Sequence, residues 1–159
     1  MKAATKVIAS VPKGHYVVAI SGGVDSMVLL DMLVRQTTCT FVVAHVDHGI
    51  RPDSLQDYLL VQNTARHYKR RFYGCRVSLG AAASEAIARK VRYDFLLSVQ
   101  QREGADGLMT AHHQDDMVES VILQVARGTY RKGLSPLRHQ NIVRPLLTYT
   151  KEQLKTYAT

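Results

Sequence analysis

The stretch AISGGVDSMVLL, residues 19–30, decides the fold of this chain. It overlaps the apolar, β-branched run HYVVAI (15–20) and continues into residues 25–35, whose apolar side chains have helical spacing. Glycines between a strand and a helix let backbone N–H groups approach an anion closely, and the helix N-terminus adds the positive end of its dipole. The stretch therefore predicts a strand, an anion-binding turn and a buried helix.

Strands and helices alternate along the rest of the chain. Strands are expected over 15–20, 40–48, 71–78, 107–112 and 141–147, and helices over 25–35, 55–68, 85–101, 115–126 and 150–158. Right-handed crossovers join such strands in parallel, so we expect an α/β, Rossmann-like fold: a five-stranded parallel sheet with helices on both faces. The third strand is the more polar one, which favours a place near an edge of the sheet.

Apolar side chains at helical spacing predict the buried faces of three later helices. They are Leu59, Leu60 and Val61 in the first, Ile87, Val91, Phe95 and Val99 in the second, and Val118, Ile122 and Val125 in the third. Each set is expected to pack against the sheet.

Length and composition bound the class of protein. The 159 residues have the length of one domain, so residues 1–159 are expected to form a single domain. No apolar run reaches the roughly 18–20 residues that span a bilayer, and we expect a cytoplasmic protein with no membrane partner. Cys39 and Cys75 lie in apolar runs and are expected to be buried thiols. A net charge of +8 favours a polyanionic partner such as nucleic acid, although a merely basic surface has the same composition.

Three polar clusters stand at the ends of three of the expected strands. They are SGGVDS (21–26), HVDHGIR (45–51) and AHHQDD (111–116). In open parallel sheets, ligands bind beyond the carboxyl ends of the strands, close to the point where the strand order reverses. We therefore expect the three clusters to meet in one site.

The glycine turn indicates which anion this site binds. A dinucleotide-binding G-x-G-x-x-G is absent, and so is the P-loop pattern G-x-x-x-x-G-K-[ST]. Asp25 is a carboxylate beside an anion site, which is stable only with a cation between them, and Mg²⁺ suits carboxylate and phosphate oxygens. A tight turn in which Asp25 merely caps the helix is the alternative.

A second cluster surrounds the next acidic residues. His112, Asp116 and Glu119 are spaced i, i+4, i+7, which predicts an imidazole and two carboxylates on one helix face. Asp116 could join Asp25 around magnesium, or the cluster could be a solvated helix start. A different hypothesis joins His45, Asp47 and His48 with the H-H-x-D-D segment, which together could hold two metals in a phosphoesterase or another metal-dependent hydrolase. That hypothesis leaves the glycine turn unexplained.

The S-G-G-x-D-S turn resembles the PP-loop of ATP pyrophosphatases, which share the adenine nucleotide alpha hydrolase-like fold. Further motifs resemble the tRNA(Ile)-lysidine synthetases of that superfamily, in order and over nearly the whole chain. These motifs are HVDHGIR (45–51), EAIARKVRYDFL (85–96), TAHHQDDMVES (110–120), ARG followed by GLSPL (126–137), and RPLL (144–147). Thiolation enzymes that pair the turn with C-x-x-C are disfavoured, because C-x-x-C is absent.

The resemblance implies a reaction that uses ATP and Mg²⁺. The wobble cytidine of the CAU anticodon of tRNA(Ile) is adenylated at C2, and free L-lysine is then joined to it with release of AMP. The phosphate-binding residues would be Ser21, Gly22, Gly23, Val24, Asp25 and Ser26. Asp25 would hold magnesium together with Asp116, and His45 and Asp47 would frame the adenosine.

The same resemblance implies roles for the residues that bind lysine and for those that assist the departure of pyrophosphate. Asp116 and Glu119 would recognise the substrate lysine, and His112 would support them. Arg92, in the A-R-x-x-R-Y segment, would stabilise the charge that develops as pyrophosphate leaves. For neighbouring Arg89, an ion pair with Glu85 is an equally weighted interpretation.

Lysidine synthetases continue beyond the R-P-L-L strand with further conserved segments and usually with tRNA-binding modules. The sequence ends at Thr159, so we expect a catalytic domain truncated at its C-terminal end, without the tRNA-binding C-terminal domains; a minimal homologue is the alternative. Two other functions stay open besides the phosphoesterase. They are another PP-loop ATP pyrophosphatase, of the tRNA thiolation or amidotransferase type, and a nucleotide-binding module that is inactive alone.

Overall fold

The computed structural model of the chain describes residues 11–36, 38–80, 82–126 and 141–159. The GLSPL motif lies outside the described residues. The strands are β1 (His15–Ala19), β2 (Thr40–Asp47), β3 (Phe72–Arg76), β4 (Gly107–Met109) and β5 (Ile142–Val143). The helices are α1 (Val24–Gln36), α2 (Ser54–His67), α3 (Glu85–Glu103), α4 (Gln114–Ala126) and α5 (Lys151–Ala158). The expected alternation of strand and helix is confirmed.

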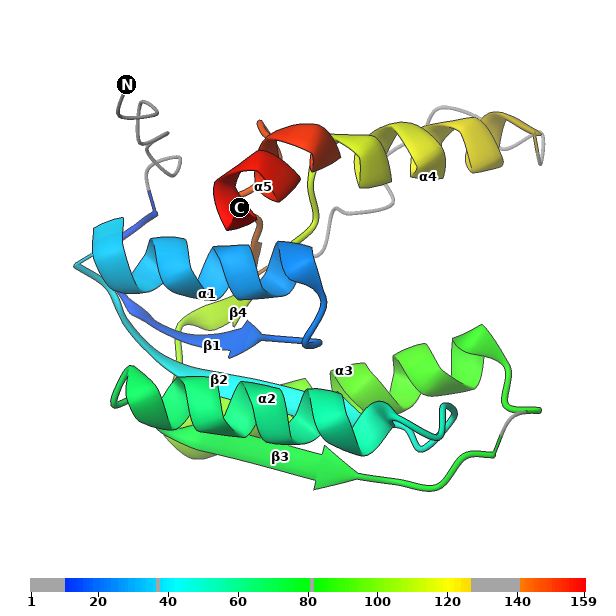
Figure 1. The fold of residues 1–159 in the computed structure, drawn as a ribbon, viewed down its shortest axis with the longest axis horizontal. Helices are drawn as coiled ribbons and strands as arrows, with labels where there is room; N and C mark the ends of the chain where they lie inside the picture. Colours follow the sequence, from blue (N-terminus) through cyan, green and yellow to red (C-terminus); the bar gives the residue numbers. More distant parts are fainter. Residues whose placement is uncertain (1–10, 37, 81, 127–140) are drawn as a thin grey trace.

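The five strands form one parallel sheet in the order β3-β2-β1-β4-β5 (Figure 1). Val17 of β1 pairs with Val42 on one side and with Leu108 on the other. The chain moves outward from β1 to β2 and β3, then returns to the other side of β1 for β4 and β5. The strand order therefore reverses between β1 and β4, and the prediction that the third strand lies at an edge is confirmed.

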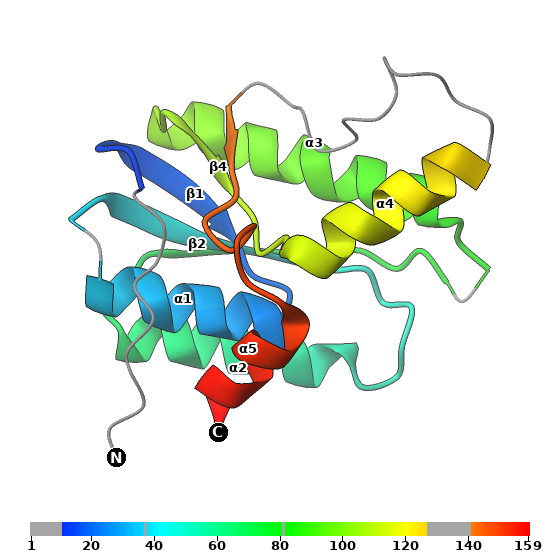
Figure 2. The same cartoon turned by 90° about the horizontal axis from the view of Figure 1, so that it is seen from above.

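Helices cover both faces of the sheet, as expected (Figure 2). Side chains of a strand alternate between the faces, so Val18 of β1 packs on the side of α1 and α2, in one core with Leu29 and Val61. Val17 points to the opposite face and packs with Leu96 of α3. These two apolar clusters fix α1, α2 and α3 against the sheet.

The last helix closes the side of the sheet that α1 covers. Thr150 and Gln153 form a capping box at the start of α5, and Leu154 is fully buried in the same core as α1. Asp31, in the middle of α1, accepts hydrogen bonds from the Tyr157 hydroxyl at 2.8 Å and from the Tyr68 hydroxyl at 2.6 Å. The helix α1 is thereby connected to both α5 and the end of α2.

The later strands are shorter than expected. β4 ends at Met109 instead of residue 112, and β5 contains two residues of the seven expected. Pro145 has no N–H to donate to a neighbouring strand, which stops the ladder soon after Val143. The residues beyond Met109 are therefore released from the sheet and can contribute to a site.

The expected buried faces of α2 and α3 are only partly right. Leu59 and Leu60 are exposed and only Val61 is buried, because three consecutive residues of a helix spread over about 200° and cannot share one face. In α3, positions four apart drift by about 40° per step, so Ile87 at the start of the expected stripe faces solvent while Val99 is buried.

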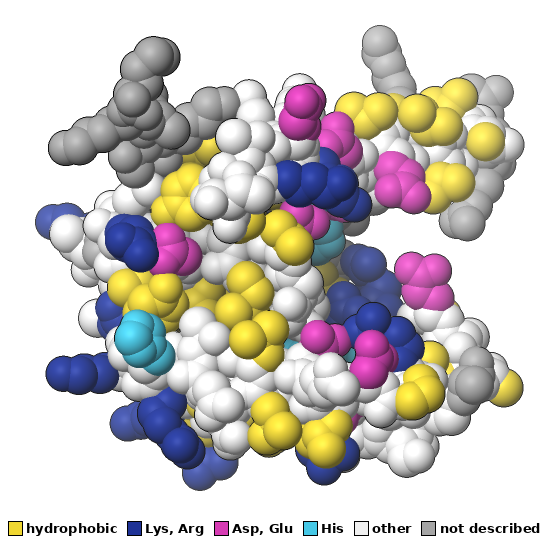
Figure 3. Space-filling model, viewed as in Figure 1, with side chains coloured by type: hydrophobic (Ala, Val, Ile, Leu, Met, Phe, Trp, Pro, Cys, Tyr) yellow, Lys and Arg dark blue, Asp and Glu magenta, His cyan; other side chains and the backbone are white. Residues whose placement is uncertain are grey.

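The expected burial of α4 is wrong. Val118, Ile122 and Val125 are 52%, 61% and 63% exposed, and Leu123 is also exposed. The helix projects from the body of the molecule, and its apolar side chains are visible on the surface (Figures 1 and 3). The spacing correctly predicted a helix with an apolar side, but not that this side would face away from the sheet.

Both cysteines are free thiols. Cys39 is buried just before β2, whereas Cys75 in the edge strand β3 is only partly buried, so the expectation of two buried thiols holds for Cys39 alone. None of the helices in the described ranges is long and apolar enough to cross a membrane.

Candidate nucleotide site

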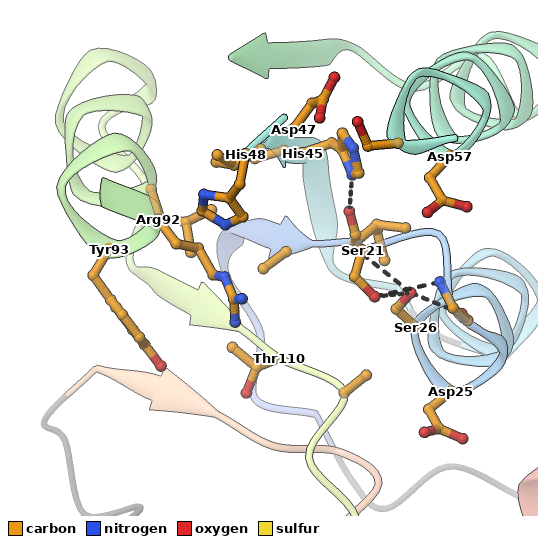
Figure 4. A pocket seen from close by; sticks show the side chains of 18 of the residues that line it. Ser21, Asp25, Ser26, His45, Asp47, His48, Asp57, Arg92, Tyr93 and Thr110 are labelled. Carbon is orange, nitrogen blue, oxygen red and sulfur yellow. Dashed lines mark hydrogen bonds between the residues drawn. The ribbon is translucent and has the colours of Figure 1, made fainter. Parts of the chain in front are cut away.

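A cavity of about 460 Å³ opens at the carboxyl ends of β1, β2 and β4 (Figure 4). Its polar lining comes from the three predicted clusters, from Thr110 and from α2 and α3, and includes Ser21, Gly23, Asp25, Ser26, His45, Asp47, His48, Ser54, Asp57, Arg92, Tyr93, Thr110 and His112. The expectation that the clusters meet at one edge is confirmed. Gly22, Val24, Asp116 and Glu119 lie outside the lining.

The bend between β1 and α1 is held by its own side chains. The Ser26 hydroxyl accepts from the Ser21 N–H at 3.1 Å and donates to the Gly23 carbonyl at 2.9 Å. The Gly23 N–H points at the Ser21 hydroxyl oxygen at 3.3 Å. Gly22 has φ +90°, where a Cβ would also approach the Asp57 Cβ to 3.0 Å, so glycine is needed there. The first turn of α1 faces the cavity with N–H groups that have no partner within the helix.

A buried histidine joins two carboxylates next to this bend, and the sequence interpretation missed it. His113 is 3% exposed, and its Nε2 lies 3.3 Å from Asp25 Oδ2 and 3.4 Å from Asp116 Oδ2. Its backbone N–H donates to the same Asp116 oxygen at 2.9 Å. An Nε2–H group can contact both carboxylates, so His113 links Asp25 to Asp116, the two residues of the magnesium prediction.

The extended backbone after β4 explains why His113, and not His112, lies next to Asp25 and Asp116. Met109 packs in the core that contains α1, and His113 contacts Asp25 at the start of α1, whereas Thr110 and His112 line the cavity. The signal in the sequence was the period of two, continued past the end of the strand. The predicted helical face of His112, Asp116 and Glu119 is therefore wrong, because α4 begins at Gln114.

The fit of this region to a magnesium ion depends on Asp25. Its Oδ1 atom is buried without a hydrogen-bond partner, and an unpartnered carboxylate oxygen is a group that a hard cation binds. Asp25 and Asp116 therefore fit magnesium as the acidic part of its coordination. In the described part of the chain, no group of three or more His, Cys, Asp or Glu side chains has a metal-binding arrangement. The two-metal phosphoesterase hypothesis has no support from this region.

Two histidines on the floor of the cavity are held neutral. Burial lowers the pKa of His112, and Arg144, Arg89 and Arg92 lower it further against the opposing effect of Asp116. Its Nδ1 is 2.7 Å from the Thr110 hydroxyl. These groups make His112 a hydrogen-bonding residue that stays uncharged at neutral pH.

Burial also lowers the pKa of His48, with a further contribution from Arg92. The Arg92 side chain extends from α3 between His48 and Thr110 (Figure 4). Arg92 is thus the cation that faces the centre of the cavity. Arg89, one turn earlier, lies over the Tyr93 ring at 5.1 Å.

The end of β2 carries the predicted adenosine-side residues. The His45 Nδ1–H donates to the Ile20 carbonyl at 2.7 Å, and its Nε2 is buried without a partner. Burial raises the pKa of Asp47, but hydrogen bonds from Ser54, the Gly49 N–H and Arg76 outweigh this and leave the pKa lowered. The carboxylate of Asp47 mainly holds the loop after β2, whereas His45 still has a free nitrogen.

The fold and this site define a class of protein: α/β domains that bind an anionic ligand in a glycine-containing bend where the strand order reverses. A family model described as the PP-loop domain matches residues 1–159, and the chain belongs to that family.

Curated relatives are similar to this chain over most of its length. It is 42% identical over 152 residues to the tRNA(Ile)-lysidine synthase of Thermus thermophilus, a match that covers 92% of this chain and 30% of that protein. It is 37% identical to the tRNA(Ile)-lysidine synthase of Enterococcus faecalis, over 92% of this chain and 34% of that protein. The chain therefore spans about a third of the length of these relatives.

Two solved structures share the fold. The U34-tRNA thiolase NcsA from Methanococcus maripaludis superposes with a TM-score of 0.76 at 18% identity, covering 92% of this chain and 56% of that one. The NH3-dependent NAD synthetase from Campylobacter jejuni superposes with a TM-score of 0.58 at 13% identity, covering 91% and 62%. These similarities support the predicted adenine nucleotide alpha hydrolase-like fold.

Proposed function

We propose that this chain is the ATP-using catalytic domain of a tRNA(Ile)-lysidine synthase. The observation that carries the proposal is the cavity between the Ser21–Ser26 bend and Arg92, with the His113-linked carboxylates beside it. The names of the relatives point in the same direction. Those relatives are about three times longer than this chain, so their activity is a proposal for this domain.

The nucleotide is proposed to bind with its phosphates at the bend. The N–H groups at the start of α1 and the positive end of its dipole favour a triphosphate there. Magnesium, held by Asp25 with Asp116, would neutralise phosphate charge when bound. His45, with its free Nε2, and Asp47 lie on the β2 side of the cavity, where the adenosine would bind.

The tRNA substrate is proposed to enter from the β4 side. The C2 oxygen of the wobble cytidine attacks the α-phosphate, an O–P bond forms, and pyrophosphate leaves. Arg92 faces the centre of the cavity and would stabilise the charge that develops on the leaving group. The net charge of +8 supports an RNA partner, because phosphate neutralisation dominates such binding.

The second step requires that the attacking amine of lysine is uncharged, so its ammonium group first loses a proton. The lysine nitrogen then displaces AMP from C2: a C–N bond forms, the C2–O bond to AMP breaks, and the nitrogen releases a second proton. Asp116 and Glu119, which lie outside the cavity lining, are proposed to bind the substrate lysine through its ammonium group, and neutral His112 lines the cavity beside them. Glu119 is exposed on α4, one turn beyond Asp116, so it is accessible to a ligand that extends from the cavity.

The proposal is tested by pyrophosphate release. The chain is incubated with ATP, Mg²⁺ and tRNA(Ile) bearing CAU, with and without lysine, and lysidine in the product RNA is measured by mass spectrometry. Release that requires this tRNA, with lysidine formed when lysine is present, supports the synthase. A tRNA with another anticodon and the Asp25→Asn variant are the controls and are expected to give neither.

Other results would assign the site differently. Pyrophosphate release without any tRNA would indicate another PP-loop ATP pyrophosphatase. Binding of an ATP analogue with no turnover would indicate a nucleotide-binding module that acts with a partner. Cleavage of a phosphodiester without ATP would restore the phosphoesterase hypothesis.

A further inference from the structure

A second cationic group lies beyond the cavity, at the outer end of the sheet. Val143 of β5 pairs with Met109 of β4, and the Thr110 N–H donates to the Val143 carbonyl at 3.1 Å. Arg144 therefore follows the sheet edge next to Thr110, which lines the cavity. Since β4 separates β5 from β1, Arg144 is two strands away from the Ser21–Ser26 bend.

Arg144 is a half-buried residue, and two of its three guanidinium nitrogens lack a partner. Its Nε and Nη2 atoms are both shielded from solvent, and neither has a hydrogen-bond partner among the described residues. Arginine keeps its charge in proteins, so burial does not remove the need for a counter-charge. A buried guanidinium with two unpartnered donors is the kind of group that an anionic ligand would complete.

The surroundings of Arg144 increase the need of its guanidinium for a negative partner. Burial lowers the pKa of Arg144, and Arg89 lowers it further, against a raising effect from Tyr93. Arg89 stacks on the Tyr93 ring, and His112 beside them is kept neutral. No carboxylate in the described ranges forms an ion pair with either arginine. Two guanidinium groups thus share one region without a negative partner.

We propose that Arg144 and Arg89 form a subsite for a backbone phosphate of the bound RNA. This rests on the proposed function above. The phosphate would be one that flanks the base inserted into the cavity, because Arg144 lies on the β4–β5 side and is not among the cavity-lining residues. The planar fork of a guanidinium fits two phosphate oxygens. The triphosphate of ATP would be held at the other side of β4 by the bend.

The test compares two ligands across variants of one position. Arg144→Gln and Arg144→Lys are titrated with the anticodon stem-loop of tRNA(Ile) at several salt concentrations and with a non-hydrolysable ATP analogue. Arg144→Gln should bind the RNA roughly five- to tenfold more weakly, with a salt slope lower by about one, and bind the analogue within about twofold of wild type. Arg144→Lys keeps the charge without the fork, so it should retain the salt slope and lose only part of the affinity.

A matched control is Arg66→Gln, which removes an exposed arginine from the last turn of α2, at the opposite edge of the sheet. It should change RNA affinity less than twofold. The midpoint of thermal unfolding of Arg144→Gln should equal or exceed that of wild type, since an unpaired buried charge is removed; a large fall would assign Arg144 a structural role and overturn the subsite.

The outcomes separate this subsite from the proposed function. Unchanged RNA affinity and salt slope in Arg144→Gln, with wild type binding the RNA, overturn the subsite alone. An equal loss of affinity for the ATP analogue assigns the guanidinium to the nucleotide instead. A wild-type chain that binds the analogue but no RNA overturns the proposed function together with the subsite.

Discussion

The two adjacent glycines of the bend should respond differently to the same substitution. Gly22 has φ +90°, and a Cβ there would lie 3.0 Å from the Asp57 Cβ and 3.3 Å from its Cγ. A left-handed backbone costs an L-residue about 1–2 kcal/mol, before any cost of moving Asp57. Because each kcal/mol corresponds to about 2–4 °C for a chain of this size, Gly22→Ala should lower the thermal midpoint by roughly 2–8 °C.

Gly23 provides the matched control. A Cβ on Gly23 would meet nothing closer than the Ser21 hydroxyl at 3.5 Å, an ordinary contact, and its φ is not in the left-handed region. Gly23→Ala should therefore fold with a thermal midpoint within about 2 °C of wild type, since alanine at a compatible site also restricts the unfolded chain. Gly23 lines the cavity, however, so the added methyl group should weaken binding of an ATP analogue.

The assay is thermal unfolding followed by circular dichroism, together with calorimetric titration of the analogue into each variant. A Gly22→Ala protein as stable as wild type would refute the conclusion that the bend requires glycine. A Gly23→Ala protein that is stable and binds the analogue as wild type does would show that the bend is not where the phosphates lie.

Further predictions concern the elements that support the site. Hydrogen bonds from Tyr73, Arg71 and His15 lower the pKa of Glu103 from 4.5 to about 2, so its contribution to stability is complete above about pH 4.5 and is lost as the pH falls towards 2. Glu103→Gln should flatten the pH dependence of urea unfolding in that window and lower stability at pH 7; an unchanged acid profile would contradict this role. Leu154→Ala removes a fully buried side chain of α5 and should lower the free energy of unfolding by about 2–5 kcal/mol in the same assay. Exposed Lys155→Ala is the control, and equal effects of the two would mean that α5 is not docked on α1.

The sequence predicted most of the fold because alternation of β-branched runs with helical spacing is a local pattern. The order of elements and the parallel sheet follow from it, and the more polar composition of residues 71–78 indicated the edge position of β3. Local spacing could not predict that Val118 and Ile122 face solvent, because that depends on whether another element packs against α4. A helix with an apolar side has the same pattern in both cases.

At the site, too, local sequence patterns predicted some features, whereas others depend on tertiary packing. The glycine bend and the three polar clusters were recognisable, because each is a short run of residues after a strand. The choice between His112 and His113 depended on where β4 ends, which the pairing with β5 determines. Arg144 belonged to a recognised motif, but its buried, unpartnered guanidinium depends on tertiary packing that no local pattern contains.

The attachment of α1 has a consequence for nucleotide binding. The Asp31 carboxylate accepts hydrogen bonds from Tyr68 and Tyr157, which lie 37 and 126 residues further along the chain. These contacts fix α1 to the end of α2 and to α5. The bend at its N-terminus is fixed with it, because Ser26 and Gly23 belong to the first turn and the residues just before it. The conformational entropy of the residues proposed to bind phosphate is thus lost when the protein folds. A triphosphate would meet a preorganised turn and would retain more of its interaction energy as affinity.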